Sequence, residues 1–273
     1  MTRRLDSILL HAVLIAGGAI TLFPLFWMVS ASLMTAGEAA AFPPHVVPHQ
    51  PTLDHYRELF VRLNLGRAFL SSAIVAVAVT IFSVLFGSMA GYAFARLRFG
   101  GRERLFGLLL MALVIPPQVG MLPLFLLMKT LGLVNSYWGA IIPSMVTVFG
   151  IFLIRQFMLS VPQELLEAAR IDGASEFRIY WSVVLPLARP ILATLATFMF
   201  MSTWNDFMWP LIILSDQAHY TLPVALANLS GEHVQDIELM MAGSVVTVMP
   251  VLAVFMFLQR YYIAGIMQGS VKG

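Results

Sequence analysis

Residues 160–190 read SVPQELLEAARIDGASEFRIYWSVVLPLARP and form a long polar stretch between apolar blocks. Ser160 and Gln163 have the spacing of a capping box, and Pro162 falls in the first helical turn, where its missing N–H costs nothing. The helix should end at Gly173, because glycine accepts the left-handed conformation that closes a last turn. We therefore predict a short amphipathic helix in the first half of this stretch.

A second short helix is predicted from Ser175, with Glu176 in its first turn, where an acidic side chain suits the positive end of the helix dipole. Pro186 and Pro190 mark the point at which the stretch gives way to the next apolar run. The alternative is a loop that merely contains two helices. Such a loop would not need small residues and a glycine at fixed intervals.

The composition indicates a membrane protein. The chain has 273 residues, of which 59% are hydrophobic and 11% charged, against about 45–50% and about 25% in soluble domains. The formal net charge is +2, but the basic residues are scattered, so no nucleic-acid partner is expected. The absence of cysteine excludes disulfides, thiolate metal sites and a cysteine nucleophile.

Six apolar blocks are long enough to cross a bilayer, which takes about 20 residues in a helix. We predict an all-α polytopic membrane protein with one transmembrane domain over residues 1–273. The predicted spans cover about 8–33, 68–95, 105–128, 138–158, 187–214 and 239–259.

Smaller features refine this outline. Gly87, Ala90 and Gly91 form a strip of small residues in the second span, which predicts close helix packing.

A short helix is expected over 53–63, and residues 215–238 are expected to form an outside loop with a turn at Thr221–Pro223. The histidines His45, His49 and His55 have no carboxylate at a suitable spacing, so no metal site is expected.

The distribution of charge predicts the orientation of the chain. With six spans, twelve lysines and arginines fall on the side of the two termini and four on the other side. The positive-inside rule then places both termini and residues 160–190 in the cytoplasm.

The polar stretch resembles the EAA motif of ABC-importer permeases, EAA-x3-G-x9-I-x-LP. Only the isoleucine position departs, as Val183. The whole chain is similar to the second permease of maltose-type carbohydrate importers, up to its end QRYYIAGIMQGSVKG. By this resemblance, the residues that couple to an ATPase are Glu167, Ala168, Ala169, Asp172, Gly173, Leu185 and Pro186.

The resemblance implies a type I permease fold in the bacterial inner membrane. It also implies two ATPase subunits, a second permease, an extracytoplasmic solute-binding protein and a carbohydrate substrate. The chain has no G-x-x-x-x-G-K-[ST] motif, so it is expected to bind no cofactor itself. ATP and Mg²⁺ would belong to the partner ATPase, and the C-terminal tail is expected to reach the ATPase interface.

Four residues are candidates for the solute pathway. Gln118 follows the proline pair in the third span, and Trp204, Asn205 and Asp206 lie within the fifth. Freed backbone groups at prolines are tolerated in a membrane inside protein or beside water, so the third span either lines the pathway or is a packing kink. Asp206 is the one acidic residue in a predicted span. It either contacts solute, caps a broken helix or pairs with another subunit.

Other classes of protein fit less well. An intramembrane hydrolase would need catalytic pairs at usable spacing, and a secondary transporter would show internal repeats and more charged groups within spans. Within transport, the alternative is a permease for a non-sugar solute such as glycerol phosphate or a polyol.

Overall fold

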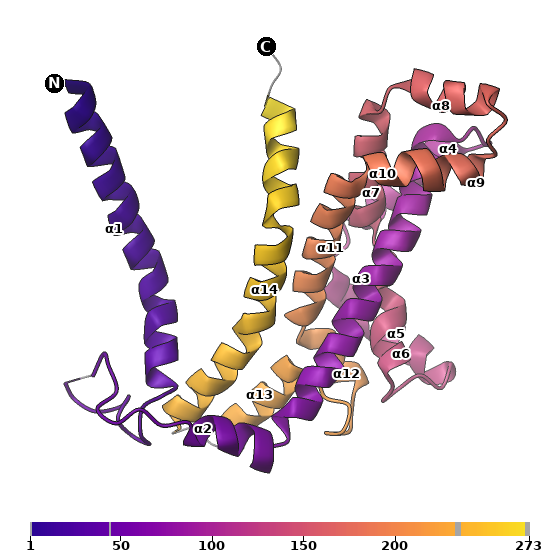
Figure 1. Cartoon of the computed structure of the whole chain (residues 1–273). Helices are drawn as coiled ribbons and strands as arrows, with labels where there is room; N and C mark the ends of the chain where they lie inside the picture. The colour runs from indigo at the N-terminus through magenta and orange to yellow at the C-terminus, as the bar shows by residue number, and fades with distance from the viewer. Residues whose placement is uncertain (1, 44, 233–235, 271–273) are drawn as a thin grey trace. The chain divides into compact units, whose positions relative to one another are not determined.

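The computed structural model describes residues 2–43, 45–232 and 236–270, and every regular element in that part of the chain is a helix (Figure 1). In these residues, four helical stretches are long and apolar enough to cross a membrane: Leu9–Ala31, Leu65–Arg96, Tyr137–Ser160 and Ile237–Gln259. Two bent helix pairs meet the same test together. If each bent pair is one span, the described residues contain six candidate spans, although the second pair, Glu176–Trp204, begins before the predicted fifth span over 187–214.

The chain divides into two compact units, of which the first comprises Met1–Gly66 and Ala225–Pro250. A helix over 53–63 is confirmed, as a short α-helix followed by a π-helical turn. The helices of this unit are α1 (Thr2–Ala31), α2 (Asp54–Arg57), the turn η1 (Glu58–Arg62), most of α13 (Leu222–Glu232) and the first part of α14 (Ile237–Ser270).

The expectation of a loop over 215–238 is wrong for its middle part, where the chain forms α13. Pro223 was interpreted as a turn residue, but it lies in the first turn of this helix, where a proline removes no intrahelical hydrogen bond. Leu222 and Leu229 are buried one above the other, two turns apart, which gives the helix an inner face.

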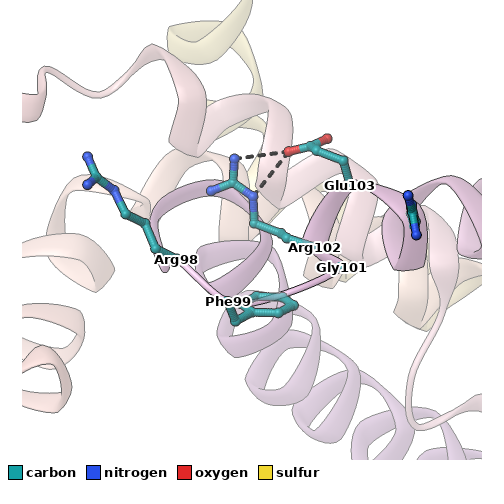
Figure 2. A pocket seen from close by; sticks show the side chains of 6 residues that line it. Arg98, Phe99, Gly101, Arg102 and Glu103 are labelled. Carbon is teal, nitrogen blue, oxygen red and sulfur yellow. Dashed lines mark hydrogen bonds and ion pairs between the residues drawn. The ribbon is translucent and has the colours of Figure 1, made fainter.

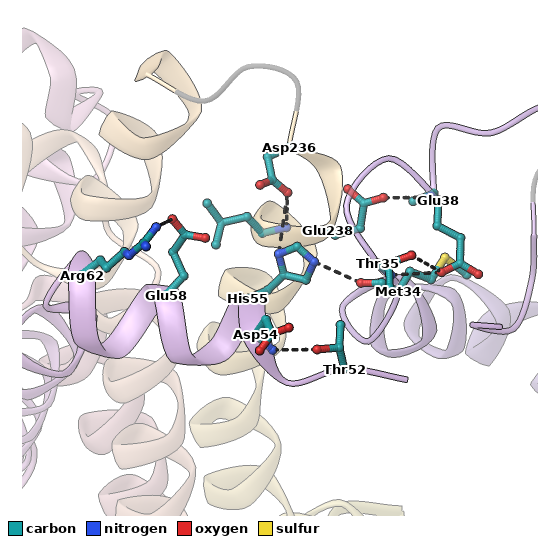
Figure 3. Close-up of polar contacts among 12 residues, drawn as sticks. Met34, Thr35, Glu38, Thr52, Asp54, His55, Glu58, Arg62, Asp236 and Glu238 are labelled. Carbon is teal, nitrogen blue, oxygen red and sulfur yellow. Dashed lines mark hydrogen bonds and ion pairs between the residues drawn. The ribbon is translucent and has the colours of Figure 1, made fainter. Parts of the chain in front are cut away.

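Polar contacts hold the loop after α1 to neighbouring segments (Figure 3). The Glu38 carboxylate accepts hydrogen bonds from the backbone N–H groups of His49 (2.8 Å) and Thr35 (3.0 Å), which lower its pKa to about 2. The buried Glu238 carboxylate accepts from the Ala39 N–H at 2.8 Å. His55 Nε2 lies 3.0 Å from the Met34 carbonyl. The fold thus supplies histidines with polar neighbours that sequence spacing did not reveal.

The second unit comprises Arg67–Val224 and Val251–Gly273. Its core gathers buried side chains from many helices, including Val79, Ile154 and Leu195. The elements in order are α3 (Leu65–Arg96), α4 (Arg102–Ala112), α5 (Pro117–Thr130), α6 (Tyr137–Ile141), η2 (Ile142–Ser144), α7 (Val148–Ser160), α8 (Gln163–Ile171), α9 (Glu176–Ile179), η3 (Tyr180–Val184), α10 (Leu185–Leu187), α11 (Arg189–Trp204) and α12 (Met208–Ile213).

The predicted close packing of the second span is confirmed. A Cβ placed on Gly91 would lie 2.7 Å from the Cβ of Ile154 in α7, so only glycine fits there. A Cβ on Gly87 would lie 3.7 Å from the backbone of Gly150 in the same helix. The small residues of α3 therefore allow α7 to lie against its backbone.

Two of the predicted spans are broken. The third is divided at Pro116 and Pro117 into α4 and α5, which meet at 101°. The fifth, predicted over 187–214, ends as a helix at Trp204, and α12 follows after a break. The cause of the first break is that proline lacks the N–H and its ring excludes the preceding residue from helical geometry.

Candidate coupling site

The predicted helix in the polar stretch is α8, and a Schellman motif ends it. Gly173 has a φ of +80°, its N–H donates to the Arg170 carbonyl at 3.0 Å, and the Ala174 N–H donates to the Ala169 carbonyl at 3.0 Å. These two bonds satisfy carbonyls that would otherwise lack partners at the helix end. The predicted end of the helix at Asp172 and Gly173 is confirmed.

The predicted capping box at the start of α8 is wrong. Ser160 is the last residue of α7, and its hydroxyl donates to the Phe157 carbonyl at 2.7 Å. Pro162 precedes α8 in an extended conformation, and Gln163 donates to Glu167 at 2.6 Å along the exposed surface. The serine serves the helix that ends there, because the two helices are separated by only two residues.

The second predicted helix begins as expected. The Ser175 hydroxyl accepts a hydrogen bond from the Arg178 N–H at 3.3 Å, and Glu176 lies in the first turn of α9. Helical backbone continues through η3 and α10, so Leu185 and Pro186 lie at the far end of this segment. The stretch Glu176–Leu187 then meets α11 at an angle of 79°.

An ion pair connects the two short helices and ties them to the end of α3. Arg170 Nε in α8 donates to Glu176 Oε1 in α9 at 2.7 Å, and the hydroxyl of Tyr92 in α3 donates to Glu176 Oε2 at 2.7 Å. One turn earlier in α3, Ser88 shares a hydrogen bond of 2.7 Å with the buried hydroxyl of Tyr180. The carboxylate of Glu176 is thus held from both sides.

Two arginines fix the helix that leads into α8. The guanidinium of Arg96, at the end of α3, donates to the carbonyls of Met158 and Val161, the last of them between α7 and α8. Arg155 in α7 forms an ion pair with Glu103 at 3.1 Å and lies 4.0 Å from the ring centre of Phe106. The chain that enters residues 160–190, called the coupling segment from here on, is therefore anchored to α3 and α4.

The predicted coupling residues divide between the surface and the core: Ala169 and Leu185 are half-buried and pack against the core, whereas the others are exposed. Glu167, Ala168 and Gly173 are exposed, and a Cβ on Gly173 would meet nothing within 4 Å. Ile171 is 85% exposed, whereas Leu166 is 1% exposed and points into the core. Leu165 is exposed, whereas its neighbour Leu166 gives α8 its buried contact. Small and apolar side chains remain available for a partner.

The four candidate residues of the solute pathway have separate environments. Gln118 is exposed near the start of α5. Trp204 is 1% exposed and packs against the rings of Phe69 and Phe200. The Asn205 amide donates to the Met201 carbonyl of its own helix at 2.7 Å.

Asp206 lies in the break between α11 and α12. Its carboxylate accepts a hydrogen bond from the Trp209 N–H at 3.4 Å, in the first turn of α12. This geometry is that of a cap on a broken helix, which was one of the alternatives for this residue. The indole N–H of Trp209 donates in turn to the Gly139 carbonyl at 3.0 Å, which fixes α12 against α6.

Sequence reasoning missed the residues that support the segment from α3. Ser88, Tyr92 and Arg96 recur at intervals of four, which places three polar residues on one face of a largely apolar span. That pattern was available as a signal. Their partners lie more than 60 residues away in the chain and could not be assigned from spacing.

Residues 83–268 match the family described as binding-protein-dependent transport system inner membrane component. The chain belongs to this family. It is therefore an ABC-importer permease of the inner membrane and not an enzyme, since ATP hydrolysis in such a system belongs to a separate ATPase subunit. The matched region includes the whole coupling segment and the residues of α3 that support it.

This family member has curated relatives that cover almost its full length. It is 39% identical over 93% of its length to the arabinooligosaccharides transport system permease protein AraQ of Halalkalibacterium halodurans, of which 92% is covered. It is 34% identical over 96% of its length to the diacetylchitobiose uptake system permease protein NgcG of Streptomyces coelicolor, of which 88% is covered.

A solved structure confirms the type I permease fold. It is a chain of a bacterial ABC transporter involved in the import of the acidic polysaccharide alginate. The TM-score is 0.83 at 25% identity, and the alignment covers 96% of this permease and 98% of that chain.

Proposed function

We propose that this permease pairs with a second permease to form the pathway for a sugar or oligosaccharide. In this proposal, the importer contains two ATPase subunits that bind ATP and Mg²⁺, and α8 docks into one of them. The observation that carries it is the exposed face of α8, where Glu167, Ala168 and Gly173 leave room for a close approach of another protein. Small side chains permit such an approach between backbones.

The supports of the segment give it a mechanical role. Force applied to α8 reaches α9 through the ion pair of Arg170 and Glu176, and reaches α3 through Tyr92. Charge-assisted hydrogen bonds at 2.7 Å are among the stronger polar contacts. A displacement of α8 would therefore be transmitted to a membrane span instead of being absorbed in a loose loop.

The choice of a sugar rests on the relatives, whose names specify arabinooligosaccharides, diacetylchitobiose and alginate. A polyol or glycerol phosphate would be the alternative solute. An extracytoplasmic binding protein would deliver the solute. Of the pathway candidates, Gln118 and Asn205 are exposed and face the pathway in this proposal, whereas Trp204 is buried and Asp206 accepts a hydrogen bond at the start of α12.

The proposed orientation has both termini and the coupling segment in the cytoplasm, and the excess of basic residues on that side supports it. We also propose that the C-terminal tail beyond residue 259 reaches the ATPase interface. The backbone of this tail is helical to Ser270, and residues 271–273 lie outside the described residues.

Cysteine crosslinking tests the docking of α8. The chain contains no cysteine, so Ala168→Cys introduces a single thiol on the exposed face. In the purified complex, this variant should crosslink to an ATPase subunit carrying single cysteines around its permease-facing cleft. Thr130→Cys, at the exposed last residue of α5, is the matched control and should not crosslink. Crosslinking of neither variant, or of both, would contradict the proposed docking.

A transport assay tests the solute. Proteoliposomes with the complete importer should take up a labelled sugar or oligosaccharide when its binding protein is present. Uptake of glycerol phosphate or a polyol with no response to any sugar would overturn the carbohydrate assignment and leave the docking of α8 intact.

A further inference from the structure

A hollow of about 580 Å³ lies at the loop between α3 and α4 (Figure 2). Arg98, Arg102 and Arg104 line it, together with Phe99, Gly101 and Glu103. Gly101 has a φ of +78°, and the turn that it forms brings basic residues from both sides of a glycine pair to one place.

The hollow is positively charged. Three arginines and one glutamate leave a net charge of +2 over residues 98–104. Glu103 is occupied by Arg102 at 3.0 Å and by Arg155 at 3.1 Å. Arg98 and Arg104 form no ion pair within the described part of the chain, so they are available to an anion.

One arginine of the hollow is held in place. Arg102 Nη1 donates to the Leu97 carbonyl at 3.1 Å, and its other groups contact Glu103. A guanidinium fixed in this way loses little side-chain entropy when a ligand arrives. The hollow therefore has one fixed arginine, Arg102, beside Arg98 and Arg104, which form no ion pair in the described residues.

An apolar stripe begins directly below the charges. Arg104, Leu108 and Met111 follow at i, i+4 and i+7, and thus share one face of α4. Leu108 and Met111 are 59% and 60% exposed, whereas Phe106 on the opposite face is buried. Phe99, at the tip of the loop, is 41% exposed. From loop to helix, the surface changes from cationic to apolar within about 13 Å at 1.5 Å per residue.

The sequence of a cationic surface followed by an apolar surface complements an anionic phospholipid, in which a charged headgroup at the cytoplasmic surface is followed by acyl chains. Clusters of basic residues next to the cytoplasmic end of a span attract anionic headgroups, and long basic side chains place their charge at the interface while their stems lie on apolar surface. We propose that this hollow binds the phosphate of an anionic phospholipid through Arg98 and Arg104, with an acyl chain along Leu108 and Met111.

The proposal rests on the cytoplasmic orientation proposed above, because anionic lipid attracts basic loops chiefly at that surface. An acidic patch on the ATPase is the competing occupant. The continuous stripe from Arg104 to Met111 favours lipid. A soluble ATPase bound to the arginines would not reach the apolar side chains of this stripe, because they lie at the depth of the bilayer.

Native mass spectrometry of the purified importer complex tests the site. Phosphatidylglycerol is titrated into the complex, with phosphatidylcholine and inorganic phosphate as separate arms. The wild-type complex should retain phosphatidylglycerol and neither of the others. The double variant Arg98→Gln/Arg104→Gln should bind phosphatidylglycerol about 30-fold more weakly, at about 1 kcal/mol for each basic residue removed.

The matched control is Arg57→Gln/Arg62→Gln, which removes two exposed arginines from α2 and η1 and should leave lipid binding unchanged. Equal losses in both double variants would overturn a defined site. Binding of inorganic phosphate as tight as that of the lipid would also overturn it. So would loss of the ATPase from the complex with unchanged lipid binding, because the loop would then contact the ATPase.

Labelling of Gly100→Cys separates this proposal from the orientation. Gly100 has open space around it, and the thiol would be the only one in the chain. Labelling from the cytoplasmic side, together with the expected weaker lipid binding of the Arg98→Gln/Arg104→Gln variant, supports both the orientation and the lipid site. Labelling from the outside would overturn the orientation and, with it, a site in the cytoplasmic leaflet.

Discussion

At the scale of single residues, Gly173 has the most demanding position in the coupling segment. Its φ of +80° costs other L-residues about 1–2 kcal/mol, although a side chain there would meet no atom within 4 Å. The requirement is therefore one of backbone conformation and not of space within this chain.

We predict that Gly173→Leu inserts normally but abolishes solute-stimulated ATP hydrolysis in the reconstituted complex, because the end of α8 is strained and its docking face is filled. Gly173→Asn should retain more activity, since asparagine tolerates the left-handed region. Gly107→Leu, in open surroundings on α4, is the control. Normal coupled turnover in Gly173→Leu would contradict the role of this residue.

Glu38 makes stability depend on pH. Hydrogen bonds from the backbone of His49 and Thr35 lower its pKa from 4.5 to about 2. A carboxylate whose pKa is lower in the folded state stabilises the fold above pH 4.5, and this contribution is lost as the pH falls toward 2.

We predict that thermal unfolding in detergent shows a difference between wild type and Glu38→Gln that is full at pH 6 and narrows steadily below pH 4.5. Glu58→Gln, which breaks the exposed pair with Arg62, is the control and should change the unfolding temperature little. A constant difference between pH 6 and pH 3 would show that the charge of Glu38 is not what stabilises this loop.

Local sequence signals determined residue roles only where the partner is near in the chain. Gly173 and Ser175 were predicted correctly because glycine at a helix end and serine at a helix start act on backbone two to four residues away. Ser160 was assigned to the wrong helix because a hydroxyl between two helix ends can bond to the backbone of the helix before it or of the helix after it. Glu176 was predicted from its helix dipole alone, whereas its partners Tyr92 and Arg170 depend on the fold.

At the scale of helices, the contact between α3 and α7 positions the coupling segment. Gly91 allows Ile154 to approach, and Arg96 then reaches the carbonyls at the end of α7. The pair acts as one support because a helix that moved away at Gly91 would also withdraw those carbonyls from Arg96.

We predict that Gly91→Leu destabilises the protein by about 1–3 kcal/mol through overpacking. The substitution Ile154→Ala should restore only part of the stability in the double variant, because it removes Cγ2, which lies 2.7 Å from the new Cβ, but keeps the Ile154 Cβ at the same distance. Chemical unfolding in detergent measures both changes. Gly107→Ala in α4 is the control and should be neutral or slightly stabilising. Full stability of Gly91→Leu would contradict the close contact.

The breaks within spans were only partly predictable. Pro116 and Pro117 predicted an interruption of the third span, but a proline pair does not determine the angle of 101° between α4 and α5. The break after Trp204 has no proline or glycine at Asn205, Asp206 or Phe207. Its signal was Asp206, a capping residue inside an apolar run, and the structure uses it in that way.

At the scale of the whole molecule, composition and hydropathy predicted an all-helical membrane protein with up to six spans, because the bilayer requires helices of a certain length. The division into two compact units was not predicted. It depends on contacts such as that of Glu238 with Ala39, which lie 199 residues apart.

We predict that this permease, expressed with its operon, co-purifies with an ATPase and a second permease in stable stoichiometry. Many large apolar side chains are exposed on the isolated chain, and the 18-residue apolar window within Leu9–Ala31 contains no buried residue. Lipid and partner subunits would have to cover them. Purification of a stable monomer that transports solute alone would indicate a secondary transporter. Mass photometry of the purified sample distinguishes the two outcomes.

The bend of 79° between Glu176–Leu187 and α11 has a geometric consequence. The two arms measure about 18 Å and about 24 Å at 1.5 Å per residue, so together they form a crank with its elbow at Ala188. Were the shorter arm swung by 3 Å at its tip, a rigid elbow would turn about 10° and carry the far end of α11 sideways by about 4 Å, given those lengths. The angle therefore converts a push across the axis of the shorter arm into a sideways displacement of the far end of α11.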